Sequence, residues 1–197
     1  VKDAINGDTI VSTIDSNVQR IVEKHITKFQ EEIGSKNASV VIADPNNGEI
    51  IAMASANGIY DLNNPRDLSG RYSEEDINKM SNSEKVEALN GIWRNYCISD
   101  SFEPGSTYKP FVVAASLQEG ILKGQETYNC DGKEVVVENT KPIRCANRTG
   151  HGLINLEEVI MFSCNDAMMS IGKSLGKGMF AKYQHNFGFG QKTGIDL

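Results

Sequence analysis

Ser106 and Lys109 stand three residues apart in the stretch Glu-Pro-Gly-Ser-Thr-Tyr-Lys-Pro, which spans residues 103–110. A helix is predicted over 107–119, because an apolar face follows the stretch and Gly120 ends it. Residues at i and i+3 share a helical face, so we expect the hydroxyl and the amine to touch. A neutral Lys109 could then take the proton of Ser106 and make its oxygen a nucleophile. The expected apolar face consists of Phe111, Ala114, Ala115 and Leu117.

A Ser-x-x-Lys pattern alone is weak evidence, since serine is a common helix cap and a lysine beside it is usually solvated. A second motif, Ser163-Cys164-Asn165, stands between two apolar helical stretches. Ser163 and Asn165 could simply cap the following helix. The order of the two motifs along the chain favours a functional interpretation of both.

In this order the two motifs resemble the transpeptidase domain of the penicillin-binding proteins, most closely the high-molecular-weight class B, monofunctional type. Ser-x-x-Lys, Ser-x-Asn and Lys-Thr-Gly form the motif set of these enzymes and of class A β-lactamases. The resemblance covers nearly the whole chain, since segments at 13–19, 41–53 and 187–197 are also similar to segments of that domain.

The resemblance implies an α/β (α+β) fold of the penicillin-binding and serine β-lactamase-like type. In this fold an antiparallel sheet is flanked by helices and a helical subdomain is added. We expect residues 1–197 to form one partial transpeptidase domain that ends before the C-terminal strands. Its expected parts are a helix with the first strands (1–55), a polar connecting region (56–101), the nucleophile helix (102–125) and a helical subdomain with the Ser-x-Asn motif (126–197).

Lys192-Thr193-Gly194 spells the third motif, but its context does not fit the catalytic copy. Ile195-Asp196-Leu197 follows it, which is similar to an earlier, noncatalytic segment of the family. The resemblance implies an oxyanion hole made by the Ser106 N–H and an N–H on the third-motif strand. Losing one such donor costs roughly 3–4 kcal/mol, so we expect this fragment to be inactive alone. Unpaired sheet edges also suggest that another chain supplies the missing portion.

The resemblance assigns catalytic roles to Ser106, Lys109, Ser163 and Asn165. Ser106 would attack the D-Ala-D-Ala bond of a peptidoglycan stem peptide, with Lys109 taking its proton. Ser163 would relay a proton to the leaving amine, while Asn165 would bind the substrate backbone and hold Lys109. Penicillin and other β-lactams would acylate Ser106, and no metal or organic cofactor is needed. A β-lactam sensor, a serine β-lactamase-like protein and a noncatalytic scaffold of a wall-synthesis complex stay open as alternatives.

Composition excludes some other classes of protein. A formal net charge of −6, with no basic cluster, argues against nucleic-acid binding. No apolar run approaches the ~20 residues that span a bilayer, so the chain itself is expected to be soluble. The resemblance implies a membrane-anchored bacterial parent with its catalytic domain on the extracytoplasmic face. Proteins of the wall-synthesis complex are its expected partners.

The chain has four cysteines, without a Cys-x-x-Cys pair. This argues against a zinc ribbon or a thioredoxin-like site. A Cys130–Cys145 disulfide stays open, because sequence cannot give the distance between the two Cα atoms. A metal site at Cys130, Cys145 and His151 is disfavoured, since the spacings match no known ligand pattern. His151 is interpreted as structural.

Periodicity predicts the elements around the motifs. We expect Asp15-Ser16-Asn17 to cap a helix, with a capping-box pattern at Ser16 and Gln19. The apolar positions of this helix run from Val18 to Ile33, and Gly34 ends it. Two apolar strands, 39–44 and 49–54, should be covered on both faces, with the first helix on one and the Ser106 helix on the other. Further helices are predicted at 73–89, 156–162 and 167–175, and a short strand at 135–137. Asn155 is expected to cap the helix at 156–162, with Glu158 completing the capping pattern.

Overall fold

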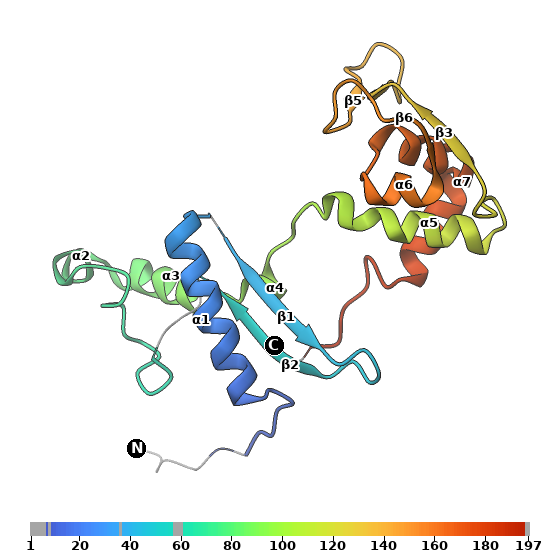
Figure 1. The fold of residues 1–197 in the computed structure, drawn as a ribbon. Helices are drawn as coiled ribbons and strands as arrows, with labels where there is room; N and C mark the ends of the chain where they lie inside the picture. Colours follow the sequence, from blue (N-terminus) through green and yellow to red (C-terminus); the bar gives the residue numbers. More distant parts are fainter. Residues whose placement is uncertain (1–6, 8, 36, 57–60, 196–197) are drawn as a thin grey trace. The chain divides into compact units, whose positions relative to one another are not determined.

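The computed structural model describes residues 7, 9–35, 37–56 and 61–195. The chain divides into two compact units, Val1–Ser101 and Phe102–Leu197. Each unit is considered by itself. The first contains a long helix, a β-hairpin and three shorter helices, and the second contains the remaining helices with two short strand pairs (Figure 1).

In the first unit, α1 (Ser16–Ile33) begins at Asp15, whose carboxylate accepts the N–H groups of Asn17 and Val18. The expected Ser16–Gln19 capping box does not form. The Gln19 amide instead pairs with the backbone of Met53, donating to its carbonyl and accepting its N–H, each at 2.9 Å. Gly34 ends the helix with φ 67°, as predicted. Gln19 therefore fastens α1 to the hairpin.

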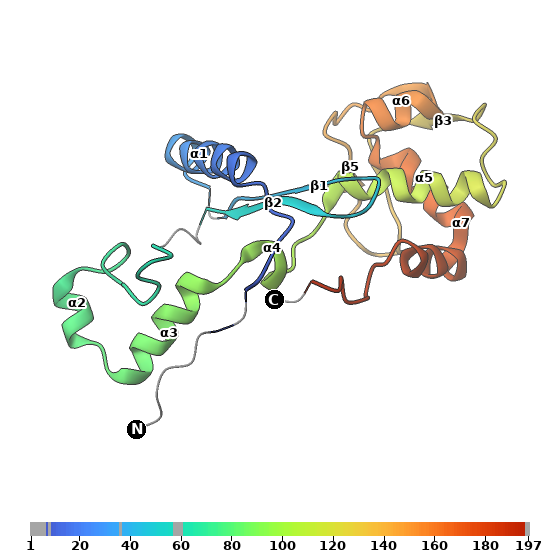
Figure 2. The same ribbon diagram turned by 90° about the horizontal axis from the view of Figure 1, so that it is seen from below.

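The hairpin consists of β1 (Ser39–Ala43) and β2 (Ile50–Ser55), paired antiparallel with Val41 opposite Met53. α1 covers one face, and α4 (Tyr96–Ser99) lies against the other (Figure 2). The core between α1 and β2 is small: Val22, Ala52 and Ala54. The prediction that both strands are covered on both faces is wrong for β1, because Val41 is 48% exposed.

The predicted helix at 73–89 is in fact two helices, α2 (Glu74–Lys79) and α3 (Asn82–Trp93). Ser81 interrupts them because it forms a capping box with Glu84. A strong capping signal inside an apolar periodicity thus starts a new helix. Leu68, Ala88 and Ile92 form the core of this part.

The second unit packs two long helices against a set of short strands. Its elements are η1 (Gly105–Tyr108, a 3₁₀ turn), α5 (Lys109–Gln118), β3 (Thr127–Cys130), β4 (Lys133–Glu134), β5 (Ile143–Arg144), β6 (Gly152–Asn155), α6 (Leu156–Met161) and α7 (Asn165–Asn186). The strand pairs β3–β6 and β4–β5 are both antiparallel. α7 is kinked at Gly176, where φ is 76°.

The core of the second unit lies between α5, α6, α7 and the strands, with Val159 and Ile171 almost fully buried. α5 buries Val112, Ala115 and Ser116, whereas Ala114 and Leu117 of the expected apolar face are exposed. The expected strand at 135–137 is also wrong. These three valines are partly exposed and follow β4 instead of forming it.

The fold is α+β, as predicted, with helices combined with antiparallel strands. Across residues 7, 9–35, 37–56 and 61–195, no helix combines the length and apolar character that crossing a membrane requires.

Candidate active site

Ser106 lies in η1, directly before α5. The predicted helix thus begins as a 3₁₀ turn, and Lys109 is the first residue of the α-helix. Gly105 has φ 58°, which allows the tight entry, and Pro110 fits the first turn because the N–H it lacks has no helical partner there. The turn presents the exposed Ser106 and the partly buried Lys109 on the same side of the chain.

Aromatic side chains pack around η1 and the start of α5. Tyr108 and Phe111 contact each other and both contact Phe189, with ring centroids 5.2–5.7 Å apart. Phe187 meets Phe111 edge-on at 4.9 Å. The segment after α7 therefore packs against the start of α5. Lys192-Thr193-Gly194 follows this segment as irregular chain and is not part of a strand.

The Ser163-Cys164-Asn165 motif forms the turn between α6 and α7. Ser163 has φ 52°, a left-handed conformation that costs a non-glycine residue on the order of 1 kcal/mol or more. Cys164 is the N-cap of α7, and its sulfur accepts the N–H of Ala167 at 3.5 Å. The capping alternative is therefore not realised by Ser163 and Asn165. Their side chains have other partners.

Lys109 connects the two motifs. Its Nζ donates to the Ser163 carbonyl at 2.6 Å, to Ser163 Oγ at 2.9 Å and to Asn165 Oδ1 at 2.6 Å. Ser163 Oγ in turn lies 2.8 Å from Ser106 Oγ. Asn165 is held from its other side, since its Nδ2 donates to the Arg144 carbonyl at 2.8 Å. The four residues singled out in the sequence thus form one hydrogen-bonded group.

One detail differs from the expectation. Ser106 and Lys109 were expected to touch directly, whereas the hydrogen bonds of the described residues connect them through Ser163 Oγ. A proton can pass along such a chain of two hydroxyls and an amine. Partial burial lowers the pKa of Lys109, and the nearby Cys164 and Cys145 sulfurs offset only part of this effect. Because its pKa is lowered, the Lys109 amine becomes neutral at a lower pH than an ordinary lysine does.

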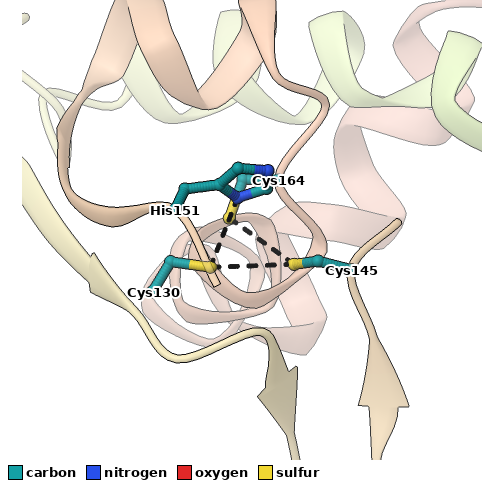
Figure 3. A group of neighbouring side chains, drawn as sticks. All are labelled: Cys130, Cys145, His151 and Cys164. Carbon is teal, nitrogen blue, oxygen red and sulfur yellow. Dashed lines mark hydrogen bonds between the residues drawn. The ribbon is translucent and has the colours of Figure 1, made fainter. Parts of the chain in front are cut away.

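Figure 3 shows a second group of side chains, which includes Cys164 of the same turn. The sulfurs of Cys130, Cys145 and Cys164 and a ring nitrogen of His151 all lie within 4.8 Å of one another. Cys130 Sγ is 3.7 Å from Cys145 Sγ and 3.4 Å from His151 Nδ1, and Cys145 Sγ is 3.8 Å from Cys164 Sγ. All four cysteines of the chain are free thiols. The Cys130–Cys145 disulfide left open by the sequence is therefore not formed.

Sequence reasoning missed this group in two ways. It gave Cys164 no role of its own, although Cys164 lies inside the second motif. It also disfavoured a metal site at Cys130, Cys145 and His151 on spacing alone, whereas the fold brings these three side chains together with Cys164. The available signal was the concentration of three cysteines and a histidine in a single segment.

The thiols differ in their electrostatics. Burial raises the pKa of Cys164 to about 12, and the neighbouring thiols raise it as well. Burial also acts to raise the pKa of Cys145, but N–H groups of Asp166 and Asn165, at the start of α7, bring it below its ordinary value. The free N–H groups at the start of α7 therefore point to the sulfur of Cys145.

Comparison with known proteins identifies the family. The family model described as "Penicillin binding protein transpeptidase domain" matches residues 38–197. The chain belongs to this family. The resemblance inferred from the motifs, to class B penicillin-binding proteins, is thereby confirmed.

Two curated relatives match over almost the whole chain. Stage V sporulation protein D of Bacillus subtilis is 34% identical over 185 residues, which is 94% of this chain and 25% of that protein. Peptidoglycan D,D-transpeptidase MrdA of Acinetobacter baumannii is 24% identical over 196 residues, which is 100% of this chain and 27% of that protein. The chain thus spans about a quarter of the length of these relatives.

Solved structures show the same fold. A crystal structure of Pseudomonas aeruginosa PBP2 in complex with WCK 5153 aligns with a TM-score of 0.71 and 24% identity, over 94% of this chain and 38% of the other. A peptidoglycan synthetase from Bifidobacterium adolescentis aligns with a TM-score of 0.75 and 24% identity, over 100% of this chain and 31% of the other.

Proposed function

We propose that this chain carries the nucleophile of a serine D,D-transpeptidase that cross-links peptidoglycan. The observation that supports the proposal most directly is the connected set of hydrogen bonds from Lys109 through Ser163 Oγ to Ser106 Oγ. Membership of the transpeptidase family and a relative named peptidoglycan D,D-transpeptidase support the same reaction.

In the first half of the reaction, Ser106 Oγ attacks the carbonyl carbon of the bond between the two D-Ala residues of a stem peptide. Its proton moves to Ser163 Oγ while the proton of Ser163 moves to the neutral Nζ of Lys109. The proton then returns through Ser163 to the amine of the departing D-Ala. The C–N bond breaks, and an ester on Ser106 is left.

In the second half, the amine of a neighbouring stem peptide attacks this ester, forms the cross-link and releases Ser106. Asn165 has two tasks, since its Oδ1 holds Lys109 and the second N–H of its Nδ2, beside the one that donates to the Arg144 carbonyl, can face the substrate backbone. β-Lactams present a strained amide in place of the D-Ala-D-Ala bond, so they acylate Ser106 and stay attached. The proposed parent protein is membrane-anchored and acts on the extracytoplasmic face, with the proteins of a wall-synthesis complex.

The test uses a fluorescent penicillin and the full-length protein that contains this chain. We expect one covalent adduct, located at Ser106 by peptide mass spectrometry and absent from Ser106→Ala. Ser101→Ala is the matched control, because Ser101 is an exposed serine a few residues away and outside the hydrogen-bonded group. Absence of any adduct on a folded protein would favour the noncatalytic scaffold and contradict the proposal.

The lifetime of the adduct separates the remaining alternatives. An adduct that persists favours the transpeptidase or a β-lactam sensor, and only the transpeptidase also joins two stem peptides. Rapid hydrolysis of the adduct favours a β-lactamase-like enzyme. The expectation that residues 1–197 alone turn over poorly stays a prediction, tested by comparing their labelling rate with that of the full-length protein.

A further inference from the structure

We propose that Phe189 is a positioning residue for the transpeptidase reaction, because its ring holds η1, the turn that carries Ser106. This role rests on the proposed function, since the placement of η1 affects the reaction only if Ser106 is the nucleophile. Phe189 follows α7 and acts through Tyr108, the last residue of η1, which directly precedes Lys109. The ring centroids of Phe189 and Tyr108 are 5.2 Å apart.

Two aromatic side chains of the segment after α7 contact the start of α5. Phe189 meets Phe111 edge-on, with ring centroids 5.3 Å apart and planes at 85°. Phe187 meets the same ring at 4.9 Å and 78°. Edge-to-face pairs at these distances are an arrangement that aromatic rings prefer. Tyr108 and Phe111 stand on either side of Lys109 in the sequence, so a ring that contacts both restrains the backbone at this lysine.

The way in which α7 ends places Phe189. Gly188 has φ 85°, and its N–H donates to the His185 carbonyl at 2.9 Å. The N–H of Phe189 donates to the Gln184 carbonyl at 3.0 Å. These two bonds and the left-handed glycine form a Schellman motif, a common way in which a helix ends at glycine. Phe189 is the residue of this motif that often makes an apolar contact, and here its ring contacts η1 and α5.

Helix α7 meets the catalytic group at its start and η1 just after its end. Its first residue is Asn165, whose Oδ1 accepts a hydrogen bond from Lys109 at 2.6 Å. A straight helix of 22 residues is about 33 Å long, so its two ends could not both reach the first turn of α5. The kink at Gly176 allows this, and the second half of α7 packs against α5. There Glu119, directly after α5, accepts the Tyr183 hydroxyl at 2.9 Å.

The turn η1 is weakly held by its own hydrogen bonds. It is a 3₁₀ turn of four residues, and such turns have poorer hydrogen-bond geometry than an α-helix. In the part of the chain that the structure describes, no side chain caps η1. Ser106 is exposed, and its proton route begins with the 2.8 Å contact to Ser163 Oγ. A displacement of η1 by ~1 Å would disturb this contact, and a misplacement of that size can slow a reaction by about 10²-fold.

The test measures how fast penicillin acylates Ser106 of the full-length protein over a range of penicillin concentrations. Phe189→Ala should lower the rate constant at saturation by about 10²-fold and leave the half-saturating concentration unchanged, because the ring acts on the placement of the hydroxyl. Phe189→Tyr should recover most of the rate, since Phe189 is 39% exposed and an added hydroxyl can stay in solvent. Phe189→Leu keeps part of the apolar surface and should lose less than the alanine variant, which it replaces in the comparison if that variant does not fold.

Two controls separate positioning from a loss of stability. Ile154→Val removes a buried methyl group from the core of the same unit, so it should lower the unfolding midpoint and leave the acylation rate per folded molecule unchanged. Phe29→Ala removes a partly exposed ring from α1 and should leave this rate unchanged. An unchanged rate constant in Phe189→Ala would overturn the role of Phe189. So would a loss that Ile154→Val reproduces, that Phe189→Tyr retains in full, or that lies wholly in the half-saturating concentration.

Hydrogen exchange tests the placement of η1 without relying on the reaction. We expect Phe189→Ala to speed the exchange of the amides of residues 105–112 and to leave that of α6 at the wild-type rate. Exchange that does not respond would overturn the restraint on η1. A folded wild-type protein that penicillin does not label would instead contradict the transpeptidase proposal, and faster exchange in Phe189→Ala would still show that the ring holds η1.

Discussion

The two sides of the Ser163–Asn165 turn carry polar groups of opposite kinds. On one side, the side chains of Ser163 and Asn165 join Lys109 and Ser106 in hydrogen bonds at a partly open surface. On the other side, the sulfur of Cys164 is buried among two further cysteines and a histidine. The two environments are contacted by consecutive residues, because Cys164 stands between Ser163 and Asn165 in the sequence.

The difference indicates that one side of the turn is suited to proton transfer and the other to holding the backbone in place. The hydroxyl and amine side has exchangeable protons, a lysine with a lowered pKa and access to solvent, which is what proton transfer requires. The thiol side has buried sulfurs and glycines that permit close packing, which is what a rigid support requires. Changes on the first side should alter rates, and changes on the second should alter stability first.

The largest effect is expected from Lys109→Met. Removing the amine takes away the proton acceptor, so penicillin labelling of Ser106 should slow by about 10²–10⁴-fold. The unfolding midpoint should stay the same or rise, because a partly buried cation is removed. Stopped-flow labelling and a denaturant titration measure the two quantities.

Lys177→Met is the matched control, since Lys177 is an exposed lysine of the same unit. It should leave both the labelling rate and the midpoint unchanged. If Lys109→Met were less stable but were labelled at the unchanged rate, the interpretation that this side of the turn determines the labelling rate would be wrong.

The next effect is the pH dependence of labelling. Only the neutral amine accepts a proton, and burial holds the pKa of Lys109 below its ordinary value of 10.5. The labelling rate should therefore rise as the pH rises, about tenfold per unit well below that pKa, and level off before pH 10.5. Rates corrected for the spontaneous hydrolysis of the penicillin check this. A rate that falls over the same range would contradict the role of the neutral lysine.

The hydrogen-bonded group of Ser106, Lys109, Ser163 and Asn165 could be predicted from sequence because each of its two motifs is contiguous. Ser106 with Lys109, and Ser163 with Asn165, are local patterns whose spacing survives folding. The route between them could not be predicted. It depends on the left-handed backbone of Ser163, which directs both its carbonyl and its hydroxyl to Lys109.

The thiol group could not be predicted from spacing alone, because only tertiary structure brings together side chains that are spread over residues 130–164. The errors in the fold have a similar origin. Ser81 starts a new helix inside an apolar periodicity, and the valines at 135–137 have strand propensity without a partner strand. Tertiary context overrides propensity in the second case. Caps at Asn155 and Gly34 are local, and both were predicted.

A smaller effect, on the thiol side, is expected from Gly150→Ala. The added Cβ would overlap the Cys130 carbonyl in a conformation that L-residues avoid, so the free energy of unfolding should fall by about 1–3 kcal/mol. Gly178→Ala is the matched control, because its Cβ meets nothing within 4 Å and it lies in α7. That control should be stabilised by about 0.5–1 kcal/mol. Equal stabilisation of both variants in urea would refute the close packing at Gly150.

The smallest effect is expected from Asn155→Ala, at the start of the helix that leads into the turn. Asn155 Oδ1 accepts the Glu158 N–H at 2.9 Å, and Glu158 Oε2 accepts the Asn155 N–H at 2.8 Å. Losing the first of these caps should cost about 1 kcal/mol of unfolding free energy. Asn155→Ser, which keeps a capping oxygen, should recover most of it. Asn155 lies at the end of α6 that is farther from the turn. The rate of penicillin labelling per folded molecule should therefore stay unchanged in both variants. A slowed rate in the alanine variant alone would mean that the support of the turn extends through α6.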